Sequence, residues 1–247
     1  MGYLMQGNSP KLVREYLQKQ LKALQLKYVD LYLIHHPAGI NADEVIKHEG
    51  NTVDNTGLKL DMTTDHVALW KEMEKQVDDG LTKAIGLSNF NVKQIERILK
   101  VARIPPANLQ IEQYLYNQGK AEQELCRKKG ITMTSYSTLG SRSVPNGLLS
   151  GANLNPLQDP VVCRIAKSHN KSTGQVLLRH VPNSWASLSS LSNPIRIREN
   201  FQGGIWISLI FLVPFERKRL RVEKFFRPQG KRERSLAKSL WPEVRDT

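Results

Sequence analysis

The chain has 247 residues, of which 40% are hydrophobic and 24% are charged. These fractions are typical of a folded protein and argue against a disordered, collagen-like or disulfide-stapled chain. The length suits one large domain, two small domains, or a single α/β barrel of about 250 residues. The two cysteines, Cys126 and Cys163, show no metal-ligand spacing, so we expect no metal site and a reducing, cytoplasmic compartment.

The carboxyl end of the chain carries much of its basic charge. The formal net charge is +13, and residues 215–247 contribute +6 of it. Such a tail can contact nucleic acid or acidic lipid, but it lacks the regular aromatic spacing of a single-strand binder. The longest apolar run, residues 205–215, is too short to span a membrane. We therefore expect no nucleic-acid or membrane partner for a chain that we expect to be monomeric.

Helix and strand patterns alternate from residue 10 to about residue 180. The predicted helices span residues 12–26, 65–79, 92–102, 121–129, 160–169 and 173–180. The predicted strands span residues 28–35, 82–87, 108–112 and 131–136. Thr64 is placed to cap the second helix, Leu24 is predicted to face the core, and the polar residues 38–63 suggest a functional loop. The alternation predicts a parallel sheet with helical crossovers, and no GxGxxG follows any strand.

Five motifs, four of them at the predicted strands, point to one architecture. In chain order they are YVDLYLIHHP, LTKAIGLSNF, NLQIEQYLY, TSYSTLGS and NPIRIRENFQ. Together they resemble the aldo-keto reductase family, and the polar loop after the first motif is similar to the arthropod branch. The resemblance implies an α/β fold, an incomplete (β/α)8 TIM barrel of the aldo-keto reductase type over residues 1–202. Residues 203–247 are then an irregular basic tail outside the family domain.

The resemblance implies a cofactor, NADPH (NADP+), and a small-molecule carbonyl substrate that is reduced from aldehyde or ketone to alcohol. Barrel enzymes build their sites at the carboxyl ends of the strands, where several of these motifs lie. His35 matches the active-site histidine that orients and polarises the carbonyl. Without its motif, His35 reads as an ordinary hydrogen-bonded histidine at a strand end. His36 stands where many relatives carry Trp, which alters the wall of the substrate pocket.

The other matches concern the cofactor. Ser88, Asn89 and Gln110 match the side chains that hydrogen-bond the nicotinamide carboxamide, and Tyr136 matches the ring that stacks on it. Judged alone, Ser88, Asn89 or Asn91 also suits the N-cap of the next helix, and a strand-end Tyr suits a core. The resemblance assigns Ser137, Leu139 and Ser141 to a loop over the pyrophosphate, and Arg196, Glu199 and Asn200 to the 2′-phosphoadenosine. The last three lie at i, i+3 and i+4 on one helix face, which also describes a solvated charged face.

Two departures from the family pattern bear on activity. The family's proton donor is a Tyr supported by a Lys and an Asp on earlier strands, and none of the seven tyrosines here has a matching context. The chain therefore reads as starting just before the fourth barrel strand. Residues 181–192 (VPNSWASLSSLS) replace the expected last strand and its phosphate-binding Lys. One permissible codon choice, read from its third base, encodes SEQLGVPIIPK, so we expect a local frame shift and an irregular segment.

Three functions remain open on the sequence alone. The first is an active NADPH-dependent carbonyl reductase, and the second is a non-catalytic remnant that binds nucleotide weakly. The missing acid favours the second for this chain, because general acids typically contribute 10²–10⁴-fold to rate. The third is an interaction protein that uses its basic tail. Deleting the tail separates it from the others, since only this function would then lose its main binding activity.

Overall fold

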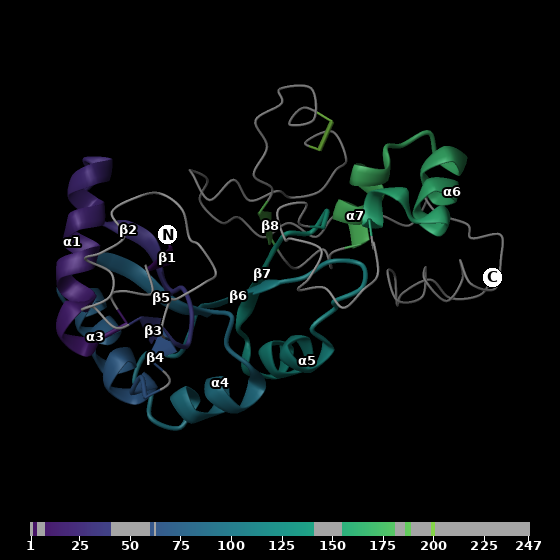
Figure 1. The fold of residues 1–247 in the computed structure, drawn as a ribbon. Helices are drawn as coiled ribbons and strands as arrows, with labels where there is room; N and C mark the ends of the chain where they lie inside the picture. Colours follow the sequence, from purple (N-terminus) through teal and green to yellow (C-terminus); the bar gives the residue numbers. More distant parts are fainter. Residues whose placement is uncertain are drawn as a thin grey trace. The chain divides into compact units, whose positions relative to one another are not determined.

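The computed structural model describes residues 2–3, 8–40, 60–61, 63–140, 155–180, 186–188 and 199–200. The chain divides into two compact units. The first holds Met1–Ile111 and Gly119–Met133, and the second holds Glu112–Gln118 and Thr134–Thr247. Each unit contains parallel strands and helices, as the alternating pattern predicts (Figure 1). In neither unit do the described strands close into a barrel, in agreement with the predicted incomplete barrel.

The sheet of the first unit is built from parallel strands. β2 (Val29–Ile34), β5 (Thr82–Ser88) and β6 (Asn108–Glu112) lie side by side in that order. β1 (Gly2–Tyr3) pairs in parallel with the free side of β2. The prediction that β2 is the first strand is therefore wrong, because two residues are too few to show an alternating pattern. β3 (Gly39–Ile40) and β4 (Leu60–Asp61) form a separate antiparallel pair inside the predicted loop.

Helices cover the outer side of this sheet. They are η2 (Pro10–Leu12), α1 (Val13–Leu24), α3 (His66–Asp78), α4 (Val92–Leu99) and α5 (Lys120–Lys129). α1 contacts α3, and α3 contacts α4, so these helices follow one another along the sheet (Figure 1). Leu17, Trp70 and Ile95 are fully buried beneath them. Leu24 is 40% exposed, contrary to prediction, because α1 ends there and the next residue is left-handed.

Side-chain oxygens begin two of these helices. Asp65, and not the predicted Thr64, caps α3 by accepting two backbone N–H groups at 3.0 Å each. Asn91 caps α4 in a reciprocal capping box. A cap satisfies N–H groups that the first helical turn leaves without partners. Because Asn91 fills this role, Ser88 and Asn89 are left to the strand end that precedes it.

The second unit combines one strand pair with a helical cluster. β7 (Thr132–Tyr136), which crosses both units, pairs in parallel with β8 (Ala186–Leu188). η3 (Pro156–Gln158), α6 (Pro160–Ser168) and α7 (Thr173–His180) pack around Val162 and Leu177. The sequence of residues 181–192 shows no strand pattern, yet its described residues form β8, because pairing with β7 supplies order that the side chains do not signal. The structure does not test the predicted frame shift, and the predicted basic tail, residues 203–247, lies outside the described residues.

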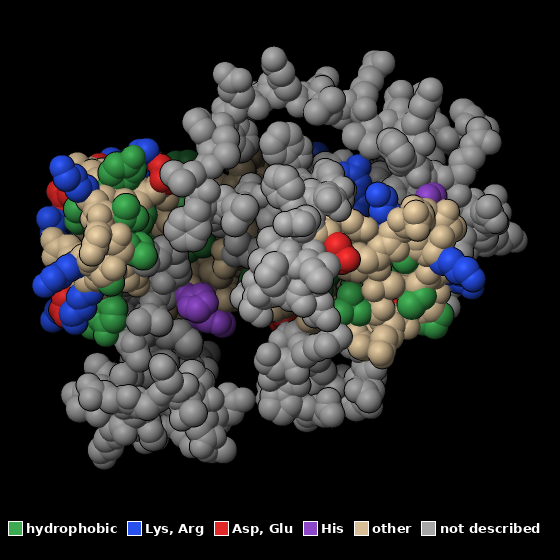
Figure 2. Space-filling view, turned by 90° about the horizontal axis from the view of Figure 1, so that it is seen from above, with side chains coloured by type: hydrophobic (Ala, Val, Ile, Leu, Met, Phe, Trp, Pro, Cys, Tyr) green, Lys and Arg blue, Asp and Glu red, His purple; other side chains and the backbone are tan. Residues whose placement is uncertain are grey.

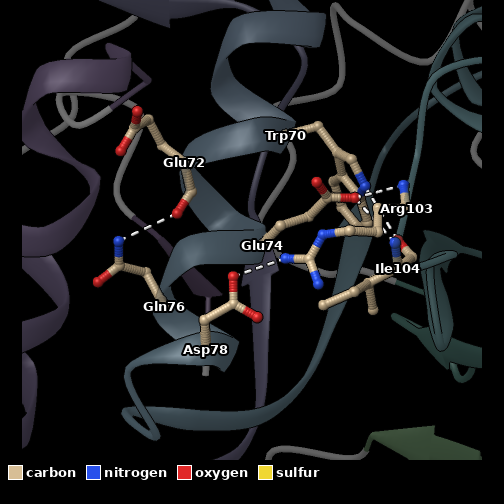
Figure 3. Close-up of polar contacts among 7 residues, drawn as sticks. All are labelled: Trp70, Glu72, Glu74, Gln76, Asp78, Arg103 and Ile104. Carbon is tan, nitrogen blue, oxygen red and sulfur yellow. Dashed lines mark hydrogen bonds and ion pairs between the residues drawn. The ribbon is translucent and has the colours of Figure 1, made fainter.

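A buried carboxylate fastens α3 to the turn between α4 and β6. Glu74 is 6% exposed and accepts the backbone N–H groups of Arg103 and Ile104 at 2.7 and 2.8 Å (Figure 3). Trp70 Nε1 donates to the Ile104 carbonyl at 3.1 Å, and the Arg103 guanidinium pairs with Asp78 at 2.6 Å. Hydrogen bonds to an ionised acceptor are roughly twice as strong as neutral ones. The Glu74 carboxylate therefore holds the turn that leads into β6.

We predict that Glu74→Gln lowers the free energy of unfolding by about 2 kcal/mol, because two charge-assisted bonds become neutral ones. Glu72→Gln is the matched control, since Glu72 lies on the same helix and pairs with Lys75 at the surface. That change should cost less than about 0.5 kcal/mol. Urea unfolding followed by circular dichroism measures both, and equal losses would contradict the role given to Glu74.

No helix in the described part of the chain is long and apolar enough to cross a membrane.

Candidate functional site

Three adjacent strands bring four of the predicted residues together in the first unit, at the carboxyl ends of β2 and β5 and in the middle of β6. His35 follows β2, Ser88 ends β5 with Asn89 directly after it, and Gln110 lies in β6. The register pairs Ser88 with Gln110 across β5 and β6. In parallel α/β folds this edge is where ligand sites are built. The structure therefore gathers the predicted catalytic histidine and the predicted carboxamide-binding residues.

Asn89 joins the three strand ends. Its backbone is left-handed, with φ of 63°, a conformation that Asn tolerates better than most residues. Its N–H donates to the Gln110 carbonyl oxygen at 2.9 Å, and its Nδ2 donates to the His35 carbonyl oxygen at 2.8 Å. The same Nδ2 lies 3.2 Å from His36 Nε2 and 3.2 Å from Ser88 Oγ. The Asn89 side chain thus contacts His35 and His36, which follow β2, and Ser88, which ends β5.

A glycine sets the separation of β5 and β6 beneath this edge. A Cβ on Gly86 would lie 2.5 Å from the Asn108 carbonyl oxygen, closer than carbon and oxygen can approach. Glycine is the residue that permits such a close backbone approach. Because Gly86 has no side chain, β6 lies close enough to β5 for the Gln110 carbonyl to accept the Asn89 N–H.

The two consecutive histidines differ in exposure. His35 is exposed and His36 is half-buried, with their ring centroids 5.4 Å apart. Partial loss of hydration lowers the pKa of His35 below the ordinary 6.5. Burial, reinforced by the charge of His35, also lowers the pKa of His36. Both rings are therefore neutral at neutral pH, which lets His36 Nε2 accept a hydrogen bond from Asn89. Figure 2 shows histidine side chains reaching the molecular surface.

The residues predicted around the rest of the cofactor fall in the second unit. Tyr136 is half-buried at the end of β7, and Ser137 after it is left-handed, with φ of 53°. Thr138 is buried, and its hydroxyl lies 2.8 Å from Ser135 Oγ. The Leu139 side chain packs against the apolar cluster of α6 and α7. The Thr138 hydroxyl and the Leu139 side chain therefore attach residues 138–139 to the rest of the second unit.

Asn200 is the most buried of the predicted phosphoadenosine residues that the structure describes. It is 5% exposed, and its Nδ2 has no hydrogen-bond partner among the described residues. The neighbouring Glu199 is exposed, and its carbonyl accepts the Gln175 Nε2 at 2.8 Å. A buried donor without an acceptor costs about 1–3 kcal/mol. Ser141 and Arg196 lie outside the described residues.

Two polar residues beside the site escape prediction. Asn8 and His66 bond the backbone of residues 36–38, across separations of about 30 positions in the chain. No local spacing marks such partners, and Asn8 ahead of a helix reads as an ordinary capping residue. Among the described residues, no three His, Cys, Asp or Glu side chains are arranged to hold a metal ion.

Comparison with known proteins is consistent across sequence and structure. The model of the aldo/keto reductase family matches residues 2–204. The chain is 40% identical over 197 residues to aldo-keto reductase family 1 member C15 of Rattus norvegicus, covering 78% of this chain and 59% of that protein. It is 39% identical over 198 residues to prostaglandin-E(2) 9-reductase of Oryctolagus cuniculus, with 78% and 59% covered.

A solved structure gives the same fold. The aldose reductase from Schistosoma japonicum superposes with a TM-score of 0.65 at 39% identity. The match covers 82% of this chain and 62% of that one. The chain therefore spans about three fifths of the length of these relatives.

The contact between Asn89 and His36 predicts a titration shift. Asn89→Asp places a negative charge about 3 Å from His36 Nε2, which stabilises the imidazolium and raises the pKa of His36. Histidine NMR titrations of the parent and the variant measure the change. Asn91→Asp is the control, since it adds the same charge to the exposed cap of α4. A His36 midpoint that moves no more in Asn89→Asp than in Asn91→Asp would show that the side chains are not in contact.

Proposed function

The chain belongs to the aldo/keto reductase family, and we propose that it binds NADPH and carries a site for reducing the carbonyl of a small aldehyde or ketone. The observation that carries the proposal is the edge at which Asn89 joins β2, β5 and β6. At this edge the predicted active-site histidine lies beside the predicted nicotinamide partners. Such convergence of polar groups at strand ends is how barrel enzymes assemble a site.

The residues at the edge of the first unit suit the nicotinamide end of the cofactor. A nicotinamide carboxamide needs a donor and an acceptor, and Ser88, Asn89 and Gln110 offer a hydroxyl and two amides. In the second unit, Asn200 carries a buried amide whose Nδ2 has no hydrogen-bond partner among the described residues. By family resemblance we assign Tyr136 to the nicotinamide face, Ser137, Leu139 and Ser141 to the pyrophosphate, and Arg196 and Glu199 to the phosphoadenosine.

When bound, NADPH supplies the hydride that reduces a carbonyl carbon. His35 is exposed and neutral at pH 7, so its ring N–H is available to hydrogen-bond and orient the carbonyl oxygen of the substrate. His36 lies directly beside it and is half-buried, which suits a side chain in the wall of the substrate pocket. Asn89 holds the backbone from which both rings project.

We further propose that these 247 residues reduce carbonyls slowly by themselves. No tyrosine in the sequence matches the family's proton donor, and the developing alkoxide needs a proton. Weak nucleotide binding without turnover is the second candidate, and the retained residues of the nicotinamide end favour it. The basic-tail function remains a hypothesis from the sequence alone, since residues 215–247 lie outside the described residues.

We propose a monomer in a reducing, cytoplasmic compartment. Cys126 and Cys163 are free thiols, and burial raises the pKa of the Cys126 thiol to about 12, so it stays protonated. Figure 2 shows basic and acidic side chains on the described surface, and some charges are paired, as Arg14 with Asp79. A mixed surface of this kind does not favour nucleic acid or acidic membranes.

The first functional prediction concerns nucleotide affinity. The phosphate-binding Lys of the family is absent from residues 181–192. Loss of one charge-assisted contact, about 1.5–3 kcal/mol, should weaken NADPH binding by roughly 10- to 150-fold relative to complete relatives. We expect NADPH and NADH to bind with similar, weak affinity in a fluorescence titration. A strong preference for NADPH would contradict this prediction.

The second concerns turnover. With a reactive aromatic aldehyde, we expect little or no consumption of NADPH by the 247-residue chain, because no proton donor is assigned. His35→Ala provides the comparison. Robust turnover that disappears in His35→Ala would show that the chain is an active reductase in which His35 works without the family's Tyr. Turnover that appears only when the family's earlier strands are added before residue 1 would support the proposal.

A further inference from the structure

The turn that follows β2 is held by side chains from other parts of the first unit. Asn8 Nδ2 donates to the carbonyl oxygens of His36 and Ala38 at 2.6 and 3.0 Å. His66 Nε2 lies 2.8 Å from the Pro37 carbonyl oxygen. A carbonyl only accepts, so this contact places the proton of His66 on Nε2. Two side chains therefore bind three consecutive carbonyls directly after the predicted active-site histidine.

The two ends of the same turn are held as well. Asn89 Nδ2 donates to the His35 carbonyl oxygen at 2.8 Å. At the far end, the Gly39 N–H donates to Thr64 Oγ1 at 3.0 Å, and Thr64 donates in turn to the Asp61 carbonyl at 3.0 Å. Every carbonyl from His35 to Ala38 thus accepts a hydrogen bond from a side chain.

These side chains are themselves fixed by packing. Asn8 is 5% exposed and His66 is 9% exposed. The His66 ring packs on Phe90, with centroids 5.1 Å apart. A Cβ on Gly39 would lie 3.3 Å from the Asn8 Cβ and 3.2 Å from Thr64 Oγ1, so little space remains around the turn. Buried hydrogen bonds in such a place are strong and restrict the backbone that they hold.

We propose that Asn8 and His66 are positioning residues that hold the His35 imidazole in place through the backbone of residues 36–38. The inference rests on the proposed function, in which His35 meets the substrate carbonyl. Asn8 and His66 hydrogen-bond the carbonyls of residues 36–38, and His35 directly precedes these residues in the chain. Misplacing a reacting group by about 1 Å costs about 10²-fold in rate, which gives such support a physical purpose.

The test compares variants that keep shape and lose the donor. Asn8→Leu removes both Asn8 bonds, and His66→Phe keeps a ring against Phe90 without a donor. His66→Gln restores a donor within reach of Pro37. Asn108→Leu is the matched control, because Asn108 is also buried and bonds Thr132 Oγ1 at 3.0 Å at the opposite end of β6.

The first readout needs no turnover. NMR signals of the histidine rings are recorded on the nucleotide-free chain. The signal of His35 is identified as the one that is missing in His35→Ala. We expect the His35 signal to shift and its pKa to rise toward the ordinary value in Asn8→Leu and His66→Phe, since a looser ring is better hydrated. His66→Gln should restore the parent signal, and Asn108→Leu should leave it unchanged. This measurement decides the proposal even if the proposed reductase activity fails.

The second readout is turnover, measured on the 247-residue chain or on the chain to which the family's earlier strands have been added, whichever reduces a carbonyl measurably. We expect kcat to fall about 10- to 100-fold in Asn8→Leu and His66→Phe, with the KM for NADPH unchanged, because the cofactor partners are untouched. If Asn8→Leu does not fold, His66→Phe and its Gln rescue decide alone. A His35 signal and pKa that stay unchanged in His66→Phe, or that change equally in Asn108→Leu, would overturn the proposal.

Discussion

The hydrogen bonds of Asn89 are the constraint on which the candidate site depends. Its N–H is committed to β6 and its Nδ2 to the end of β2, while its own backbone continues β5 in a left-handed turn. Three strand ends thereby keep a fixed relation that no single strand could impose. The chemistry proposed here needs that relation, because a carbonyl and a nicotinamide must be held by residues that are far apart in sequence.

The core of the first unit sets the frame in which Asn89 acts. Buried side chains such as Trp70 on α3 and Ile95 on α4 pack these helices against the sheet. The Glu74 carboxylate then holds the turn that precedes β6, and Gly86 lets β6 approach β5 closely. The packing of the helices, the Glu74 hydrogen bonds and the close approach at Gly86 together place β6, and with it the Gln110 carbonyl, beside β5.

The sequence predicts this site better than it predicts the surroundings that support it. His35, Ser88 and Asn89 stand at strand ends and Gln110 lies within β6, and these positions follow from hydrophobic patterns and family motifs. β1 and β8 are too short to carry a pattern, and backbone pairing with a neighbour creates them. Asn8 and His66 act through partners about 30 residues away, which no local spacing encodes. Thr64 is placed as a cap by its neighbours, yet the tertiary fold uses its hydroxyl to hold Gly39.

We propose above all that the edge formed by β2, β5 and β6 binds the nicotinamide end of the cofactor. Backbone amide NMR of the 247-residue chain, titrated with reduced nicotinamide mononucleotide, tests it without relying on turnover or on the phosphate site. We expect chemical-shift changes concentrated at His35, Ser88, Asn89 and Gln110, and their loss in Asn89→Asp. Changes confined to other residues, or identical changes in parent and variant, would contradict it.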